Sequence, residues 1–189
     1  MWIFVVNSLT PGLKDNIMTS KFLPFVNLDK INAAVASGDG DLLFSLLAEP
    51  LHEELYRRNT FDFLDELSAG QQLLVAYDYL RMQAGQGGFI QFIENGYVGL
   101  LPSMVEQLIG IGEHSMSKTL DDVLKVYVLN RDIFIGSSTL EDFAKLYDEL
   151  KEFEELDQRF SEQNLATVKF ILAYAVSHLE EFISTELLN

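Results

Sequence analysis

The chain has 189 residues, no cysteine, and 29 acidic against 13 basic residues, which gives a formal net charge of −16. Charge repulsion on this scale disfavours direct nucleic-acid binding, which depends on phosphate neutralisation by Lys and Arg, and it disfavours anionic membranes equally. Residues 61–189 carry 22 acidic and 8 basic side chains. An acidic field of this kind favours cationic partners, although it also serves simple solubility.

The first 28 residues are predicted to form a short irregular extension. Met1–Val6 has the composition of a strand, and Pro11-Gly12 interrupts it. The apolar run is too short to span a bilayer, and it lacks the basic start and cleavage site of a signal peptide. We therefore expect a cytoplasmic protein without a membrane segment.

Helical patterns follow from residue 28 onward. The first expected helix ends at Ser37-Gly38, and Pro50 is expected to separate the next two helices because proline disrupts a helix interior. The expected helices in this part are, in chain order, 28–36, 41–48, 51–58 and 61–67.

A capping box predicts the next helix start. The Ser68 hydroxyl and the Gln71 amide are spaced to satisfy each other's backbone N–H groups. Gly85-Gln86-Gly87-Gly88 is expected to break this helix, and Asn95-Gly96 to end a short helix over 89–94. Ser138 and Glu141 form a second candidate box. The remaining expected helices are one that begins at Pro102, one over 116–128, a long acidic one over 139–156, and one over 165–188.

These elements predict an all-α fold. We expect about eight helices in a single compact domain over 29–189, preceded by the extension over 1–28. No heptad pattern persists long enough for a coiled coil, and no internal repeat is evident.

The stretch Gly87-Gly88-Phe89-x-Gln91-Phe92-x-x-Asn95 resembles the DNA-mimic protein C-terminal domain family, a bacterial domain of largely unknown function. The resemblance extends upstream through Leu67–Gln71 and downstream to Leu156–Phe160, so that it covers about residues 61–185. The sequence departs from the family in one place, because Gly85-Gln86 stands where asparagines are often found.

The resemblance implies an all-α fold that is often dimeric. It also implies a protein-binding role, because at least one member imitates DNA phosphates with surface carboxylates and occupies the DNA-binding face of a transcription factor. A fold does not carry a function by itself, and the partner is therefore an expectation from the family.

One row of carboxylates is the candidate partner-binding site. On a continuous helix over 139–156, helical periodicity places four acidic residues on one face, opposite an apolar face. Phe, Tyr and Leu residues between the acids would supply apolar contact. The alternative is a solvated helix face with ion pairs to Lys145, Lys151 and Arg159. The candidate residues are Glu141, Asp148, Glu152 and Glu155, with Asp121 and Asp122 as additional contributors.

The glycine motif is expected to have a structural role. Gly87 and Gly88 could form a phosphate-binding nest, but close packing or a positive backbone angle is the favoured explanation. Gln91 and Asn95 could contact a ligand, but we expect them to satisfy the backbone of the glycine loop. Asp157 projects toward an apolar side, and we expect it to cap the following helix or to pair with an arginine.

No catalytic or metal-binding pattern is present in the sequence. His52, His114 and His178 lack known metal-ligand spacing, and Asp39-Gly40-Asp41 lacks the rest of an EF-hand loop. We therefore predict no metal, no cofactor and no enzymatic activity. The preferred hypothesis is an acidic protein-binding domain, a DNA mimic that binds a basic protein. The alternatives are an immunity-type protein that neutralises a basic nuclease or toxin and an uncharacterised enzyme or ligand-binding domain.

Overall fold

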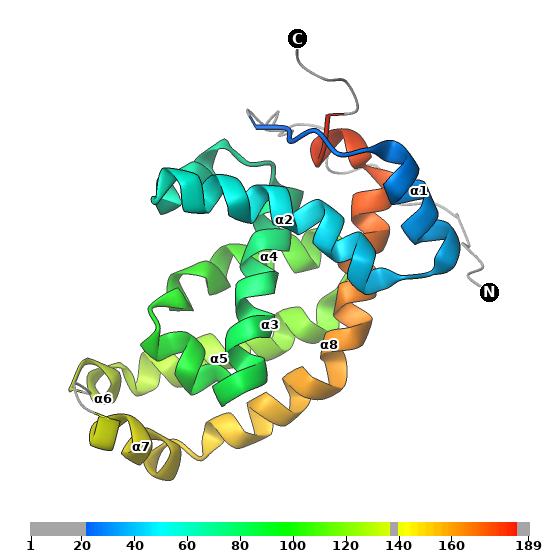
Figure 1. Ribbon diagram of the computed structural model, residues 1–189. Helices are drawn as coiled ribbons and strands as arrows, with labels where there is room; N and C mark the ends of the chain where they lie inside the picture. The colour runs from blue at the N-terminus through cyan, green and yellow to red at the C-terminus, as the bar shows by residue number, and fades with distance from the viewer. Residues whose placement is uncertain (1–21, 137–139, 185–189) are drawn as a thin grey trace. The chain divides into compact units, whose positions relative to one another are not determined.

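The described part of the chain is all-α, as the sequence predicts (Figure 1). The computed structural model describes residues 22–136 and 140–184, so the capping box predicted at Ser138 and Glu141 lies outside the described side chains. Among the described residues, the regular structure consists of α-helices and short 3-10 helices, with an isolated parallel bridge between Phe25 and Ser184.

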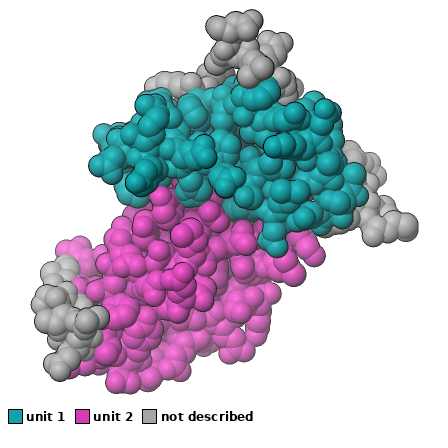
Figure 2. Space-filling model, in the orientation of Figure 1, with its two compact units in different colours: residues 1–72, 175–189 teal, residues 73–174 magenta. Residues whose placement is uncertain are grey.

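The chain divides into two compact units (Figure 2). Unit 1 comprises residues 1–72 and 175–189, and unit 2 comprises residues 73–174. The assignment of an extension over 1–28 and one domain over 29–189 stays a prediction. Within the described ranges, no helix combines the length and apolar character that a membrane span requires.

Unit 1 begins with two helices whose ends follow local sequence signals. The side chain of Asn27 accepts the backbone N–H of Asp29 at 2.8 Å and so caps α1, Leu28–Ser37. Gly38 ends this helix with a φ of 70°, in the left-handed region that glycine tolerates. Asp39 then caps α2, Gly40–Arg58, by accepting the N–H of Leu42 at 2.9 Å.

The prediction that Pro50 separates two helices was wrong, because α2 continues through it. A proline in a helix interior removes one backbone hydrogen bond and costs about 3 kcal/mol. Leu47, Ala48 and Leu51 are all buried around this position. Burial of each large apolar side chain contributes roughly 1.5–3 kcal/mol, so packing offsets the local cost and keeps one helix.

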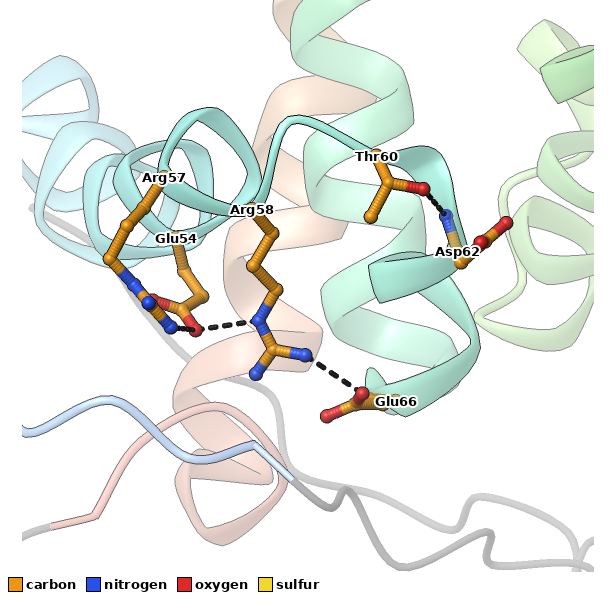
Figure 3. A network of polar contacts seen from close by, with 6 residues as sticks. All are labelled: Glu54, Arg57, Arg58, Thr60, Asp62 and Glu66. Atoms are coloured by element: carbon orange, nitrogen blue, oxygen red, sulfur yellow. Dashed lines mark hydrogen bonds and ion pairs between the residues drawn. The ribbon is translucent and has the colours of Figure 1, made fainter.

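A polar network ties the end of α2 to the 3-10 helix η1, Phe61–Glu66 (Figure 3). Glu54 accepts hydrogen bonds from Arg57 and from Arg58, and Arg58 Nη1 also donates to Glu66 Oε1 at 2.8 Å. The Arg58 guanidinium lies 4.5 Å from the ring centroid of the buried Phe63. Residues 61–67 were predicted as an α-helix, and the structure corrects this to a 3-10 turn.

The predicted capping box at Ser68 and Gln71 is confirmed. Ser68 Oγ accepts the N–H of Gln71 at 3.1 Å, and Gln71 Oε1 accepts the N–H of Ser68 at 2.9 Å. Both side chains also donate hydrogen bonds to backbone carbonyls in the C-terminal part of unit 1. Gln71 Nε2 donates to the carbonyl of Phe182 at 2.9 Å, and Ser68 Oγ donates to the carbonyl of Glu181 at 3.0 Å.

Unit 2 takes its elements from the middle of the chain. They pack around a core of fully buried residues that includes Tyr77, Phe89, Phe92 and Phe153. Its elements are α3, Ala69–Glu94, from residue 73 onward; η2, Tyr97–Leu100; α4, Leu101–Gly110; α5, His114–Leu129; α6, Arg131–Gly136; α7, Leu140–Glu149; and α8, Glu152–Ser177, up to residue 174. Another 3-10 helix, η3, Leu179–Glu181, follows α8.

The predicted helices over 139–156 and 165–188 were wrong in their boundaries. The chain leaves helical geometry at Leu150 and Lys151, which separates α7 from α8, and α8 then runs without interruption to Ser177. Neither glycine nor proline marks the turn. Leu150 is buried there, so we attribute the turn to tertiary packing and not to a local helix breaker.

Candidate functional site

The glycine motif forms a kink inside α3. Gly87 has a φ of −145° and Gly88 a φ of 69°, so the helix stops and restarts between them. The positive φ favours glycine at position 88. A Cβ atom added there would lie 2.3 Å from Asp157 Oδ2. The expectation of a positive backbone angle with close packing is therefore confirmed.

The side chains of Asp157 and Tyr147 form hydrogen bonds with the backbone at this kink. Asp157 Oδ1 accepts the N–H of Phe89 at 2.8 Å, where the second part of α3 begins. Tyr147 Oη donates to the carbonyl of Gly87 at 2.7 Å. Asp157 thus caps a helix segment 68 residues earlier in the chain, which corrects the expectation that it caps the following helix or pairs with an arginine.

Burial raises the pKa of Asp157. The hydrogen bond from Phe89 lowers the pKa and the charge of Glu154 raises it, but desolvation is the largest effect. Desolvation and the charge of Asp157 also raise the pKa of Tyr147. Both groups are therefore held in an environment that disfavours their ionised forms, as expected for structural contacts at the edge of a core.

The polar residues of the motif bond to one another. Gln91 Nε2 and Asn95 Nδ2 both donate to Gln83 Oε1, at 3.0 Å and 2.6 Å. We expected Gln91 and Asn95 to form hydrogen bonds with the backbone of the glycine loop. The structure corrects this expectation, because both side chains bond to Gln83 in a side-chain cluster. Phe89 and Phe92 are fully buried, and the Phe89 ring lies 5.6 Å from that of Phe160. The two phenylalanines of the motif thus belong to the core of unit 2, whereas its glycines and Gln91 are half-buried and Asn95 is exposed.

The carboxylates predicted to form one row are distributed over two helices. Glu141 and Asp148 belong to α7, whereas Glu152 and Glu155 lie in the first turn of α8. Asp148, Glu152 and Glu155 are exposed, and the side chain of Glu141 lies outside the described residues. The row is therefore not the face of a single helix.

The exposed acids differ in whether a basic side chain forms an ion pair with them. Lys151 Nζ lies 2.9 Å from Glu154 and 3.8 Å from Asp148. Within the described residues, Glu152 and Glu155 form no ion pair with a Lys or Arg side chain. The part of the row on α8 is thus the least neutralised, and exposed carboxylates of this kind remain available to a cationic partner.

Asp121 and Asp122 on α5 are already paired within unit 2. Lys125 Nζ lies 2.7 Å from Asp121 and 3.1 Å from Asp122, and Arg159 Nη1 lies 3.1 Å from Asp122. Partial burial raises the pKa of Asp122, but hydrogen bonds from Lys125 and then Arg159 lower it overall. These contacts match the ion-paired alternative more closely than a free acidic row.

Sequence reasoning did not detect the contacts that join distant segments. Arg159 Nη2 donates to Thr119 Oγ1 at 3.1 Å, and Thr119 Oγ1 also bonds to Gln163 Oε1 at 2.9 Å. These residues lie about 40 positions apart, and no local motif connects them. Among the residues that the structure describes, no group of three His, Cys, Asp or Glu side chains could hold a metal ion.

Fold and surface together define an acidic all-α protein with a glycine kink in α3 and exposed carboxylates on adjacent helices. A family model described as DMP19-like protein matches residues 65–178, so the chain belongs to the DMP19-like protein family. The match lies within the range of about 61–185 expected from the motifs. No curated protein matches the chain.

Proposed function

We propose that this protein binds a basic, DNA-binding protein through its acidic surface and so acts as a DNA mimic. The observation that carries the proposal is the exposure of Asp148, Glu152 and Glu155 on α7 and α8, with Glu152 and Glu155 unpaired within the described residues. Membership of the DMP19-like family supports the same function. We further propose a cytoplasmic location and a binding role without catalysis.

Helix geometry gives the acids a spacing relevant to this role. Glu152 and Glu155 are separated by about 4.5 Å along the axis of α8, because an α-helix rises about 1.5 Å per residue. Phosphates along one DNA strand rise by about 3.4 Å each. A cationic surface that binds successive phosphates can therefore contact successive carboxylates on a comparable scale.

Electrostatics should also accelerate the encounter. A net charge of −16 attracts a basic partner over long distances, and this attraction weakens as salt screens the exposed charges. Because Lys125, Lys151 and Arg159 neutralise only part of the acidic surface, we infer that Glu152 and Glu155 make the largest electrostatic contribution.

Charge reversal tests the proposal. A triple variant with Asp148→Lys, Glu152→Lys and Glu155→Lys would be compared with a control that carries Glu49→Lys, Glu53→Lys and Asp65→Lys at other exposed positions. Both variants change the net charge by the same amount. Each is used to capture proteins from a cell lysate, with and without competing duplex DNA, followed by mass spectrometry.

The expected result is a basic DNA-binding protein that the wild type and the control capture and that the α7–α8 variant loses. Added DNA should release it. Equal capture by the two variants would show that these carboxylates do not form the binding surface. A single salt-resistant partner that is indifferent to DNA would instead favour an immunity-type protein.

A further inference from the structure

The sequence predicted that Phe, Tyr and Leu side chains between the acids would contact a partner. The structure shows that these side chains are not available for such a contact. Leu150 and Phe153 are buried, and Phe143 and Tyr147 are half-buried. Tyr147 is also engaged with the carbonyl of Gly87. Any apolar contribution to binding must therefore come from other positions.

Exposed apolar side chains occur further along the same helix. On α8, Leu165 is 68% exposed and Phe170 is 47% exposed, although both are large hydrophobic residues. Ala166 is exposed between them. The outer surface of α8 therefore changes from acidic, over residues 152–162, to mainly apolar, over residues 165–170.

Helical periodicity places the two parts on one side of α8. At about 100° per residue, Glu155, Glu162 and Ala166 lie within about 40° of one another around the axis. Leu165 and Phe170 flank this line, about 140° apart, and the small side chain of Ala166 lies between them. A second helix can approach closely where a small residue is bordered by larger ones.

We propose that α8 is the docking site for a helix of the partner protein that is basic in one half and apolar in the other. This inference rests on the proposed function and specifies the structure that the partner presents. Basic side chains of the partner contact Glu152, Glu155 and Glu162, and its apolar side chains pack against Leu165 and Phe170. Charge complementarity identifies the occupant, because an acidic surface that continues into an apolar one matches a helix whose basic and apolar residues occupy successive turns.

Two synthetic peptides test the inference with the full-length protein. Each has about 18 residues, the length needed to cover residues 152–170. The first carries arginines in one half and leucines in the other, and the second has every leucine replaced by serine. Isothermal titration calorimetry is performed at about 50 mM and about 300 mM salt, which separates the screened electrostatic part from the apolar part.

We expect both peptides to bind at low salt and the leucine peptide alone to bind measurably at high salt. Leu165→Ser and Phe170→Ser should each raise its Kd by about 5- to 10-fold, because each removes apolar area from the contact. Binding of the serine peptide should not change. Leu129→Ser on α5, at a side chain that is 82% exposed, is the matched control and should affect neither peptide.

A second measurement is independent of any variant. Backbone NMR shifts of the wild-type protein should change over residues 152–170 when the leucine peptide is added, and changes confined to other helices would overturn the inference. Unchanged affinity in Leu165→Ser and Phe170→Ser, or an equal loss in Leu129→Ser, would overturn it while leaving the DNA-mimic proposal intact. Failure of both peptides to bind the wild type would contradict both.

Discussion

Asp157 Oδ1 accepts the backbone N–H of Phe89 at 2.8 Å, immediately after the two glycines where α3 leaves helical geometry. This contact joins the acidic helix α8 to the motif by which the sequence resembles its family. The same carboxylate approaches Gly88 so closely that no larger residue fits. The motif therefore stabilises the packing of α8 within unit 2.

Removal of the Asp157 carboxylate should destabilise the protein. We expect Asp157→Ala to lower the free energy of unfolding by about 1–2 kcal/mol, because the N–H of Phe89 loses its cap. Asp157→Asn keeps an oxygen acceptor and removes the desolvated charge, so its stability should equal or exceed that of the wild type. Urea unfolding near neutral pH provides both values, and an equal loss in the two variants would disprove the capping role.

A side chain at Gly88 should be strongly destabilising. Gly88→Ala combines a φ of 69° with a clash against Asp157, so we expect a loss of more than about 1–2 kcal/mol. Gly85 lies in the helical part of α3, and a Cβ atom added there would have no neighbouring atom within 4 Å. Gly85→Ala is therefore the matched control, and it should stabilise by up to about 1 kcal/mol. Thermal unfolding of the two variants should shift in opposite directions.

Loss of the buried amide of Gln71 should lower the free energy of unfolding more than loss of an ordinary helix cap does. It bonds to Ser68, to Phe182 and to the carbonyl of Phe22. Gln71→Ala leaves these groups without their partner in a buried site, so we expect a loss of about 3 kcal/mol in the free energy of unfolding. Gln158→Ala, at an exposed position of α8, should change stability by less than about 0.5 kcal/mol. A similar loss in both variants would show that the buried contacts add nothing.

The Glu54 network predicts a loss of stability in acid. Hydrogen bonds from Arg57 and then Arg58 lower the pKa of Glu54 from 4.5 to about 2. Because the folded state binds the proton less tightly, this stabilisation is present above about pH 4.5 and is lost as pH falls toward about 2. Glu54→Gln should therefore lose less stability than the wild type between about pH 6 and about pH 3.

The neighbouring exposed residue provides the control for this prediction. Glu53→Gln removes a carboxylate that has no ion pair among the described residues, and it should keep the acid sensitivity of the wild type. Denaturant unfolding at several pH values measures the effect. Identical pH profiles for Glu54→Gln and the wild type would show that the network does not affect the acid stability.

Local signals allowed much of the fold to be predicted from the sequence. Gly38 and Gly96 end helices with positive φ angles, and Ser68 with Gln71 caps α3, because each effect depends on residues a few positions apart. The continuous helix through Pro50 and the turn at Leu150 were not predictable in this way. We attribute both to the burial of Leu47, Ala48, Leu51 and Leu150, because tertiary packing can outweigh local propensity.

The candidate site was less predictable for the same reason. Helical periodicity identified exposed acids correctly, because Asp148, Glu152 and Glu155 all reach the surface. It could not reveal that the row crosses a turn between α7 and α8. Nor could it show that Asp157 bonds to Phe89, or that Arg159 bonds to Asp122, because those partners are 68 and 37 positions away.

On the proposed function, carboxylates of α7 and α8 occupy the nucleic-acid-binding surface of a basic protein. The most direct measurement is a competition titration, in which the captured basic protein is bound to a fluorescent DNA duplex and this protein is added while anisotropy is recorded. We predict that the anisotropy falls to that of free DNA with the wild type, but not with the variant reversed at Asp148, Glu152 and Glu155. A ternary complex that retains DNA, or equal displacement by both proteins, would contradict the claim.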